Sequence, residues 1–507
     1  MSQAILIVGA GPTGLVLALR LRRHGVSFRI IDQHDGPGRA SRALVIHART
    51  LEFYDQLGLS ERLIEGGTKV EAVRLREAGA EVGTIRLRDM GLGLSPFPFA
   101  LCLPQDEHEE ILVDALAAEG VNVEWGTRLD GIEPAGDAVR VSLVRGDREE
   151  RAAFAYVAGC DGAHSRVRAA IGAHFGGGTY DRLYYVADVK PRRALDPDLV
   201  VALDRGDFAL RLPSRRGENE RLIGYVPSDR ETDPRFEDVR ADAERLLGVA
   251  VAEVNWFSTY QVHHRVAARF RDGRCFLLGD AGHLHSPVGG QGMNTGIGDA
   301  VNLAWKLAAV VSGQAPPDLL DSYEPERITF ARSLVATTDR AFQVISDQGL
   351  RGRVFRTLIM PRLLPAVTHF DAGRHAMFRL LSQIRVAYPD SPLSAGRAGA
   401  VAGGDRLPWV DGADNFAPLA RLEWQLHGFG NIDAPLVEAA DGLGLPVRQF
   451  AWSSEAEKAG YRRDAAYLIR PDGYVALAAP NPSELRAFTA RWQLQSGQRR
   501  DTRREGA

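Results

Sequence analysis

The sequence predicts an α/β fold that combines a Rossmann-like nucleotide-binding domain, an interleaved mixed β-sheet domain and a C-terminal α/β domain. Three observations predict it. A short apolar run at Ala4–Val8 is followed by a glycine turn, a helical segment and a second apolar run, which is the pattern of a βαβ unit. Residues 180–226 hold several strand-like stretches without a glycine turn of their own. A loop rich in Gly, Pro and Ser at Tyr388–Leu407 then separates a further segment.

Length and composition restrict the class of protein. A chain of 507 residues suggests about three domains, and it is long enough to bury a large core. With 45% hydrophobic and 25% charged residues, the composition excludes wholesale disorder and a fibrous repeat. The formal net charge of -3 gives no electrostatic basis for binding nucleic acid.

The cysteines and the N-terminus bear on the cellular setting. Cys102, Cys160 and Cys275 are spaced too widely for a CxxC pair or a zinc knuckle, and they favour a reducing cytoplasm. The apolar N-terminal stretch Met1–Leu19 is interrupted by glycines and has no basic region before it, so we interpret it as a strand that enters a turn. No other segment approaches the roughly 20 apolar residues that a membrane span needs.

The elements are expected in the following order. Strands at Ala4–Val8 and Ser27–Ile31 flank a helix at Pro12–His24. A helix at Glu107–Glu119 precedes strands at Val121–Trp125 and Ala138–Val144. The middle sheet is expected to contain Tyr180–Val189, Phe208–Leu212 and Arg221–Val226. A strand at Cys275–Leu278 leads into a long helix that begins near Thr295, and the pattern is helical again from Tyr323 to about Val386.

A GxGxxG motif lies between the first strand and its helix, at Gly9-Ala10-Gly11-Pro12-Thr13-Gly14. In such a turn the first glycine permits the tight bend, the second lets a pyrophosphate approach the backbone, and the third allows close helix packing. Free amides at the helix N-terminus attract the diphosphate. Asp32 ends the second strand, where an acid accepts hydrogen bonds from an adenosine ribose. The motif predicts a dinucleotide site without a 2′-phosphate, and the alternative is an ordinary structural turn.

Two further motifs, taken with this turn, resemble those of a known family. One is Gly159-Cys160-Asp161-Gly162-Ala163-His164-Ser165-Arg166-Val167-Arg168. The other is Gly279-Asp280-Ala281-Gly282-His283, which is followed by Ser286-Pro287-Val288-Gly289-Gly290-Gln291-Gly292-Met293-Asn294. With the three motifs the chain resembles the class A flavin-dependent monooxygenases, the para-hydroxybenzoate hydroxylase type of aromatic hydroxylase. The resemblance implies a non-covalently bound FAD. In this family the motif at Gly159–Arg168 is called the DG motif, and the one at Gly279–His283 is called the GD motif.

The GD motif and the loop after it carry the most specific part of the resemblance. It implies that Gly279 and Asp280 bind the ribityl chain, since a carboxylate accepts hydroxyl hydrogen bonds well in a partly dry site. The alternative for Asp280 is a helix cap. The loop residues Pro287, Gly289, Gly290, Gln291 and Gly292 are expected to position the isoalloxazine ring. With Met293 and Asn294 they lead into a helix N-terminus that stabilises the negative charge of reduced flavin, and the alternative is a plain glycine-rich connection.

Four more positions are matched to the family residue by residue. Arg42 is expected to contact the cofactor diphosphate through its fork of donors, or to be a solvated surface arginine. Gln105 is expected to bind the ribityl or diphosphate region. Asp161 either contacts the cofactor or is a turn residue before Gly162, and Leu129 offers backbone groups to the adenine. No catalytic side chain is assigned, because the flavin carries the chemistry.

Two departures from the family pattern concern small residues. Gly282 and Gly298 stand where the family often has an alanine and a glutamine. The missing side chain at Gly298 either leaves room near the flavin or softens the helix. His283 and His285 suggest a metal site by their spacing, but no cysteine or acid cluster in the sequence completes one, and we expect no metal.

The segment from about Tyr388 resembles the thioredoxin-like domain of the phenol and polyketide hydroxylases in this class. It includes Arg470-Pro471-Asp472-Gly473-Tyr474-Val475-Ala476. Strands are expected at Leu436–Leu443, Arg448–Trp452 and Ala466–Ile469. Because no cysteine follows Cys275, thiol exchange is impossible here, and packing or subunit contact is the expected role. The expected domains are therefore residues 1–179 with 266–387 for FAD, 180–265 for substrate and 388–497 for the thioredoxin-like part, before a disordered tail at 498–507.

The resemblance implies an enzyme that uses NADPH or NADH and O2 to hydroxylate a phenolic or polyketide-like aromatic compound through a flavin C4a-hydroperoxide. Alternatives are an epoxidase or Baeyer-Villiger-type oxygenase, a flavoprotein reductase, and a non-catalytic flavin-binding protein. The expected partners are a small aromatic substrate, O2 and NAD(P)H, with a homodimer as an option. Neither nucleic acid nor a membrane span is expected. Tyr184, Tyr225, Arg211 and His263 are the candidates for substrate contact in the middle sheet.

Overall fold

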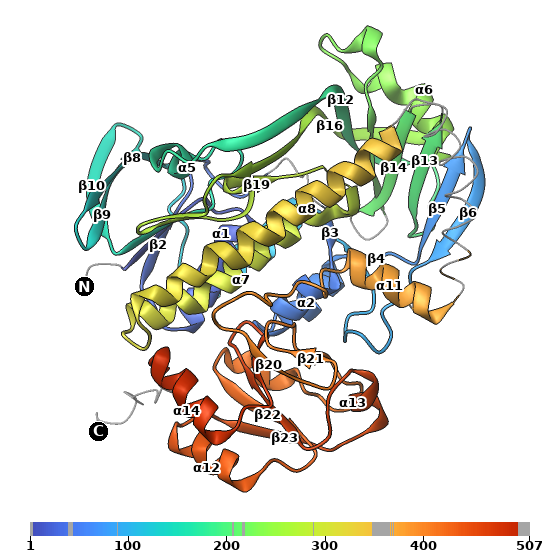
Figure 1. Ribbon diagram of the computed structural model, residues 1–507. Coiled ribbons are helices and arrows are strands. Elements are labelled where there is room, and N and C mark those ends of the chain that lie inside the picture. Colours follow the sequence, from blue (N-terminus) through green and yellow to red (C-terminus); the bar gives the residue numbers. More distant parts are fainter. Residues whose placement is uncertain are drawn as a thin grey trace, which may run out of the picture. The chain divides into compact units, whose positions relative to one another are not determined.

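The computed structural model describes residues 4–38, 44–88, 90–204, 207–214, 218–286, 288–346, 366, 368 and 370–494. The chain forms two compact units (Figure 1). The first consists of Met1–Ala304 and Tyr323–Arg385, and the second of Trp305–Ser322 and Val386–Ala507. Several expected features lie outside the described residues: Arg42, Pro287, residues 347–365 of the stretch expected to be helical, and the tail at 498–507.

A five-stranded sheet in the order β17-β18-β11-β1-β2 forms the centre of the nucleotide-binding part. The strand β1 (Ile5–Val8) pairs in parallel with β2 (Phe28–Ile31) and β11 (Tyr156–Gly159). In turn β11 pairs in parallel with β18 (Cys275–Leu277), and β17 (Arg271–Asp272) closes the edge in the antiparallel direction. All four residues of β1 are buried, as a strand covered on both faces requires. The helix α1 (Pro12–Arg23) follows the glycine turn as expected.

Short helices and two small sheets complete this part of the unit. The helices are α2 (Ala48–Asp55), α3 (Ser60–Gly66), α4 (Gln105–Ala118) and α5 (Arg166–Ala170). The sheets are formed by β3 (Val45–Ile46), β7 (Leu101–Cys102) and β4 (Thr68–Lys69), and by β8 (Thr127–Ala135), β9 (Ala138–Arg145) and β10 (Arg148–Phe154). The strand expected at Val121–Trp125 is wrong, because only Glu124 forms a single bridge, to Ile31. Gly120 and Gly126 turn the chain in left-handed conformations at both ends, so the segment is too short to pair further.

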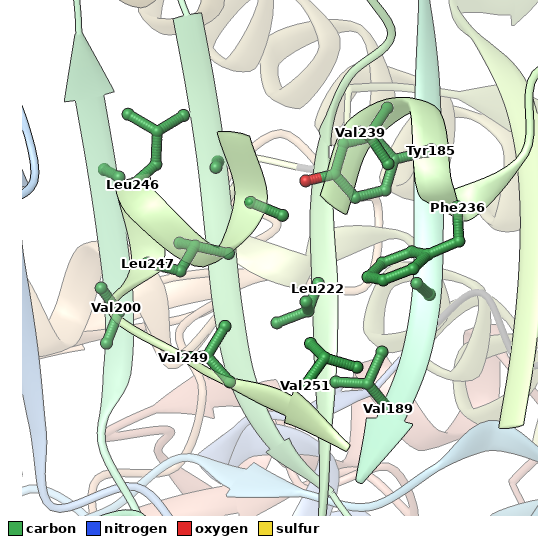
Figure 2. Close-up of a cluster of buried hydrophobic side chains, with 14 of the residues drawn as sticks. Tyr185, Val189, Val200, Leu222, Phe236, Val239, Leu246, Leu247, Val249 and Val251 are labelled. Carbon is green, nitrogen blue, oxygen red and sulfur yellow. The ribbon is translucent and has the colours of Figure 1, made fainter. Parts of the chain in front are cut away.

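An eight-stranded mixed sheet has the order β19-β16-β12-β15-β14-β13-β5-β6. Its strands are β5 (Ala72–Glu77), β6 (Ala80–Arg86), β12 (Phe175–Pro191), β13 (Leu199–Asp204), β14 (Asp207–Ser214), β15 (Asn219–Tyr225), β16 (Val251–Ala267) and β19 (His283–Leu284). The helix α6 (Phe236–Leu247) covers one face of this sheet. Figure 2 shows its side chains Phe236 and Val239 directed toward Tyr185 and Leu222 on the strands.

In the described part of the first unit, helices follow the last strand of the nucleotide-binding sheet. They are α7 (Gln291–Val311), α8 (Tyr323–Ser346) and α11 (Asp371–Leu381). The helix α7 begins four residues before the expected start near Thr295. It cannot extend further toward the N-terminus, because Gly289 and Gly290 both have positive φ angles. Among the described helices, none has the length and the apolar character that a membrane crossing requires.

The second unit is built on a six-stranded sheet in the order β21-β20-β25-β24-β22-β23. Its strands are β20 (Ala395–Ala398), β21 (Val401–Ala402), β22 (Gln425–Phe429), β23 (Val447–Phe450), β24 (Ala465–Ile469) and β25 (Val475–Ala478). The helices are α12 (Ala434–Gly442), α13 (Ser454–Lys458) and α14 (Pro482–Arg491). From β22 to α14 the order is βαβαββα, with β22 parallel to β23 and antiparallel to β24. This is the topology expected of a thioredoxin-like unit, and the predicted fold class is confirmed.

The strand expected at Leu436–Leu443 is wrong, because these residues belong to α12 and its C-cap. Leu436, Ala439 and Ala440 recur at helical spacing and pack together in the core of the second unit. Pro435 lies in the first turn of the helix, where its missing N–H costs nothing.

Candidate functional site

The glycine turn brings the N-terminus of α1 against the DG motif. A Cβ atom on Gly9, whose φ is +104°, would overlap the Cys160 carbonyl, and one on Gly14 would overlap the Gly9 carbonyl. Packing therefore demands both glycines. At Gly11, by contrast, a Cβ would meet no atom within 4 Å. The protein's own packing does not explain this second glycine, whereas a pyrophosphate that approaches the backbone between Gly11 and Pro12 does.

Asp32 lies at the end of β2 beside this turn. Its Oδ2 accepts a hydrogen bond from the Ala10 amide at 2.8 Å, and its Oδ1 accepts one from the His34 amide at 2.9 Å. The Thr127 amide donates to the Asp32 carbonyl at 2.8 Å, which brings the start of β8 to the same place. Leu129, a buried residue of β8, thus lies two positions from a residue bonded to Asp32. The structure brings together these predicted contacts of the adenosine half.

Gln105 is the first residue of α4, and its amide is held by a residue that the sequence analysis missed. The Gln105 Nε2 donates to Glu109 Oε1 at 2.8 Å, and the Gly38 amide donates to Glu109 Oε2 at 2.8 Å. Burial raises the pKa of the Glu109 carboxyl, with nearby Asp32 and Asp106 adding to the effect. An acid four residues after Gln105 on one helix is the signal that could have found this contact.

Asp161 caps α5. Its Oδ1 accepts a hydrogen bond from Ser165 Oγ at 2.5 Å, and its Oδ2 accepts from the amides of Arg166 at 2.7 Å and Val167 at 3.1 Å. These bonds favour the structural role for Asp161 over direct cofactor contact. Arg168, in the middle of α5, donates to the Ala281 carbonyl at 3.0 Å and so links the DG motif to the GD motif.

A fully buried ionic group holds the GD motif in place. Asp299 on α7 accepts hydrogen bonds from the Gly279 amide at 2.9 Å and from Arg327 Nε on α8 at 2.6 Å, and its Oδ2 lies 2.8 Å from His283 Nε2. Burial would raise the pKa of the Asp299 carboxyl, but the neighbouring Arg327 and His283 outweigh it, and the pKa lies below its usual value. Asp280 follows Gly279 directly and is exposed. The sequence analysis missed Asp299 and Arg327.

The space beside Gly298 is taken by Arg327. A Cβ on Gly298 would lie 3.0 Å from Arg327 Nη2, and the same guanidinium group also donates to the Thr295 carbonyl at 3.0 Å. This contact is an explanation that the sequence did not offer, and the two explanations given from the sequence stay predictions. The missing side chain makes room for the arginine that pairs with Asp299.

The glycine-rich loop after the GD motif is held by residues of the N-terminal segment. Gly289 and Gly290 have φ angles of +77° and +61°, which favour glycine. His47 Nε2 lies 2.7 Å from the Gly289 carbonyl oxygen, and Asn294 Nδ2 donates to the Gly290 carbonyl at 2.8 Å and to the Val45 carbonyl at 2.9 Å. A Cβ on Gly290 would lie 3.0 Å from Val45 Cβ. Pro287, also expected in this loop, lies outside the described residues.

Hydrogen bonds from another part of the chain hold Gln291, the first residue of α7. Its Nε2 donates to the Leu381 carbonyl at 2.9 Å, and its Oε1 accepts from Gln383 Nε2 at 2.7 Å. Gln383 is buried and has a φ of +61°, a conformation that a residue with a side chain seldom adopts. Met293 is half-buried in the first turn of α7, and Gly292 lies beside His285.

The face of the large sheet away from α6 is aromatic. Tyr184 and Tyr225 face each other on paired strands with ring centroids 4.8 Å apart, and Tyr260 lies 5.7 Å from Tyr184. Val45 packs in the cluster that covers this face, and it also touches Gly290. The aromatic face therefore adjoins the glycine-rich loop.

The other two candidates for substrate contact are engaged elsewhere in the sheet. Arg211 alternates to the α6 side of β14 and donates to the carbonyls of Asp196 and Asp198. His263 Nδ1 lies 2.7 Å from Thr179 Oγ1. Which side chains touch a substrate stays a prediction.

Comparison with known proteins identifies the family. Residues 2–338 match the family described as the FAD binding domain. The chain belongs to this family. The 6-methylpretetramide 4-monooxygenase of Streptomyces rimosus is 37% identical over 419 residues, which cover 79% of this chain and 72% of the relative. The 12-dehydrotetracycline 5-monooxygenase/anhydrotetracycline 6-monooxygenase of Streptomyces rimosus subsp. rimosus is 33% identical over 505 residues, 94% of this chain and 96% of the relative.

A solved structure supports the same assignment. The anhydrotetracycline hydroxylase from Streptomyces rimosus superposes with a TM-score of 0.79 at 30% identity and covers 98% of this chain and 100% of its own. The resemblance to the class A flavin-dependent aromatic hydroxylases is thus confirmed, and the chain is a flavin monooxygenase with FAD as its cofactor.

The residues of this FAD-binding chain fit the cofactor. Gly11 leaves the N-terminus of α1 open to a diphosphate, Asp32 offers acceptor oxygens for a ribose, and Asp280 presents an exposed carboxylate for ribityl hydroxyls. Thr13 of the glycine turn lies directly against the GD motif, since its Oγ1 would lie 2.8 Å from a Cβ on Gly279. The individual contacts of these residues with FAD stay predictions.

Proposed function

We propose that this monooxygenase hydroxylates a polycyclic, polyketide-like aromatic substrate that carries a phenol. In the overall reaction, one oxygen atom of O2 enters an aromatic C–H bond and the other leaves as water. NAD(P)H supplies a hydride, with its two electrons, and solvent supplies one proton. Bound FAD supplies the redox chemistry of this reaction. The observation that carries the proposal is the aromatic face of the large sheet, which adjoins the glycine-rich loop through Val45.

The size and chemistry of this face support a fused-ring substrate. Aromatic side chains from four strands line it, and flat aromatic rings pack favourably against one another when offset or edge-on. Its residues include Tyr180, Tyr184, Phe208, Tyr225 and Tyr260. By their names, one of the two relatives above acts on 6-methylpretetramide and the other on 12-dehydrotetracycline and anhydrotetracycline, which agrees with such a substrate.

The chain's own residues bind and orient rather than react. The amides of Gly290 and Gln291 stand at the positive end of α7, where they stabilise negative charge on a bound ring. Asp280 is proposed to accept hydrogen bonds from the ribityl chain, and the apolar cluster around Val45 excludes water on the sheet side. We further propose a cytoplasmic setting, since all three cysteines are free thiols, and a homodimer as the assembly.

The test is a screen of simple phenols and fused-ring polyketides against the purified holoenzyme. We expect a fused-ring phenol to accelerate NAD(P)H oxidation and to yield one oxygenated product per nicotinamide, with the oxygen derived from labelled O2. Hydrogen peroxide in place of product marks an analogue that is not a substrate. NAD(P)H oxidation without oxygen insertion for every compound would favour the flavoprotein reductase instead.

A further inference from the structure

The loop that carries the flavin ring in this family is held here by a histidine far away in the sequence. His47 follows β3 and is only 5% exposed. Its Nε2 lies 2.7 Å from the Gly289 carbonyl oxygen, while its own amide donates to Asn294 Oδ1 at 2.9 Å. One residue thus contacts both the loop and the first turn of α7.

We propose that His47 is a positioning residue that aims the Gly290 amide by donating its Nε2–H to the Gly289 carbonyl. The inference deepens the proposed function and rests on it for the role of the loop. A carbonyl oxygen can only accept, so the bond fixes the ring tautomer with its proton on Nε2.

The planarity of the peptide bond transmits this contact. The Gly289 C=O and the Gly290 N–H belong to one peptide unit and point in opposite directions. A donor that holds the carbonyl from one side therefore directs the N–H to the other side, away from His47. Asn294 acts in the same way on the next unit, since its bond to the Gly290 carbonyl at 2.8 Å directs the Gln291 amide.

The two glycines need such a restraint. Glycine populates left-handed and right-handed conformations about equally, so φ angles of +77° and +61° are not selected by the residues themselves. The strand β3 lies directly against the loop, because a Cβ on Gly290 would lie 3.0 Å from Val45 Cβ. His47 and Asn294 together select one of several conformations that the glycines allow.

Burial keeps this donor uncharged. The loss of water around the ring lowers the pKa of His47 to about 4, although the bonds to the loop carbonyls act in the opposite direction. At neutral pH the ring therefore directs the amides without adding a positive charge near them. A histidine that instead neutralised reduced flavin would need to be protonated.

The test compares three variants of the holoenzyme in the absence of aromatic substrate. His47→Leu removes the donor, His47→Gln keeps an amide donor of similar reach, and His427→Leu removes a buried histidine of the second unit as a matched control. The readouts are the FAD dissociation constant, measured by fluorescence titration, and the midpoint potential of the bound flavin.

We expect His47→Leu to raise the FAD dissociation constant roughly tenfold, the effect of losing one buried hydrogen bond. It should also lower the midpoint potential, because misdirected amides stabilise reduced flavin less. His47→Gln should restore most of both values, and His427→Leu should lower thermal stability without changing either.

Wild-type affinity and potential in His47→Leu would overturn the proposal, and so would a His47→Gln variant as impaired as His47→Leu. If His47→Leu does not fold, His47→Asn takes its place, because its shorter amide keeps polarity but does not reach the carbonyl. Neither readout needs a substrate, so failure of the polyketide screen leaves this result unaffected.

Discussion

The glycines of the flavin loop differ in what the structure demands of them. Gly290 is in a left-handed conformation against Val45, whereas a Cβ on Gly292 would only reach ordinary contact with His285 at 3.4 Å. Both residues lie in the same motif, and the sequence pattern treats them alike. The backbone conformation and the close approach of Val45 distinguish Gly290 from Gly292.

The substitution Gly290→Ala should therefore be costly and Gly292→Ala mild. We expect Gly290→Ala to lower the free energy of unfolding by about 1–2 kcal/mol, through strain at positive φ and crowding of Val45, and to weaken FAD binding. Urea denaturation and fluorescence titration of both variants measure the two effects. Equal losses in the two variants would contradict the assignment.

Asp280 is expected to act on the cofactor and not on the fold. It is exposed at the start of the GD motif, so Asp280→Ala should lower FAD occupancy while thermal stability of the apoprotein changes little. Asp272→Ala, another exposed acid near β18, is the matched control and should keep full occupancy. FAD affinity equal to wild type in Asp280→Ala would refute the role.

At the level of elements, the buried ionic cluster of Asp299, His283 and Arg327 connects the GD motif to α7 and α8. Arg327→Met should destabilise the protein by about 3–5 kcal/mol, because it leaves the Asp299 carboxylate buried beside only one remaining partner side chain. Arg245 is half exposed and pairs with Asp242 and Asp204 at the surface, so Arg245→Met should cost less than about 1 kcal/mol.

Calorimetry of these two variants checks the contrast. In Arg327→Met we also expect a lower FAD affinity, since the Gly279 amide depends on the same carboxylate. A cost below about 1 kcal/mol for Arg327→Met would show that the pair is worth no more than an exposed one.

The sequence predicts the elements well where one pattern dominates. The buried run at Ile5–Val8, the glycine turn and α1 are all found as expected. The segment Leu436–Leu443 was predicted as a strand because it is a short, mostly apolar run with Gly442 and Gly444 at its end, which is also the pattern of a short buried strand. In such short segments the spacing of apolar residues does not distinguish a helix from a strand.

The candidate site shows a different limit of sequence reasoning. Motif residues such as Gly11 and Asp280 carry family patterns, but His47 and Asp299 act through contacts with residues that are distant in sequence. His47 meets Gly289 across a large separation in sequence, and no local pattern encodes such a contact. The resemblance supplied the site, and the structure supplied the residues that support it.

At the scale of the whole molecule, buried neutral histidines make stability depend on pH. Burial lowers the pKa of His108 to about 3, and burial with nearby Arg20 lowers that of His24 to about 4. Between these values and the unfolded value near 6.5, the unfolded chain binds protons that the folded chain does not. The stability is therefore fully present above about pH 6.5 and is lost as the pH falls toward the folded values.

We expect each of these histidines to contribute a slope of up to about 1.4 kcal/mol per pH unit in this window. Urea denaturation inside and above the window measures it. His108→Gln should make the dependence shallower, and His174→Gln, at an exposed position, should leave it unchanged. An unaltered slope in His108→Gln would contradict this account.

The parallel sheet imposes an order on synthesis of the chain. The strand β1 leaves the ribosome before the strands around it: β2 on one side ends at Ile31, β11 on the other side ends at Gly159, and β18, which pairs with β11, ends at Leu277. One edge of β1 can pair with β2 early, but its other edge stays unpaired until β11 has emerged, and the parallel sheet is complete only after β18. Cofactor capture follows later still, because Gly279 and α7 emerge after β18, and we expect chaperones to shield β1 during this interval.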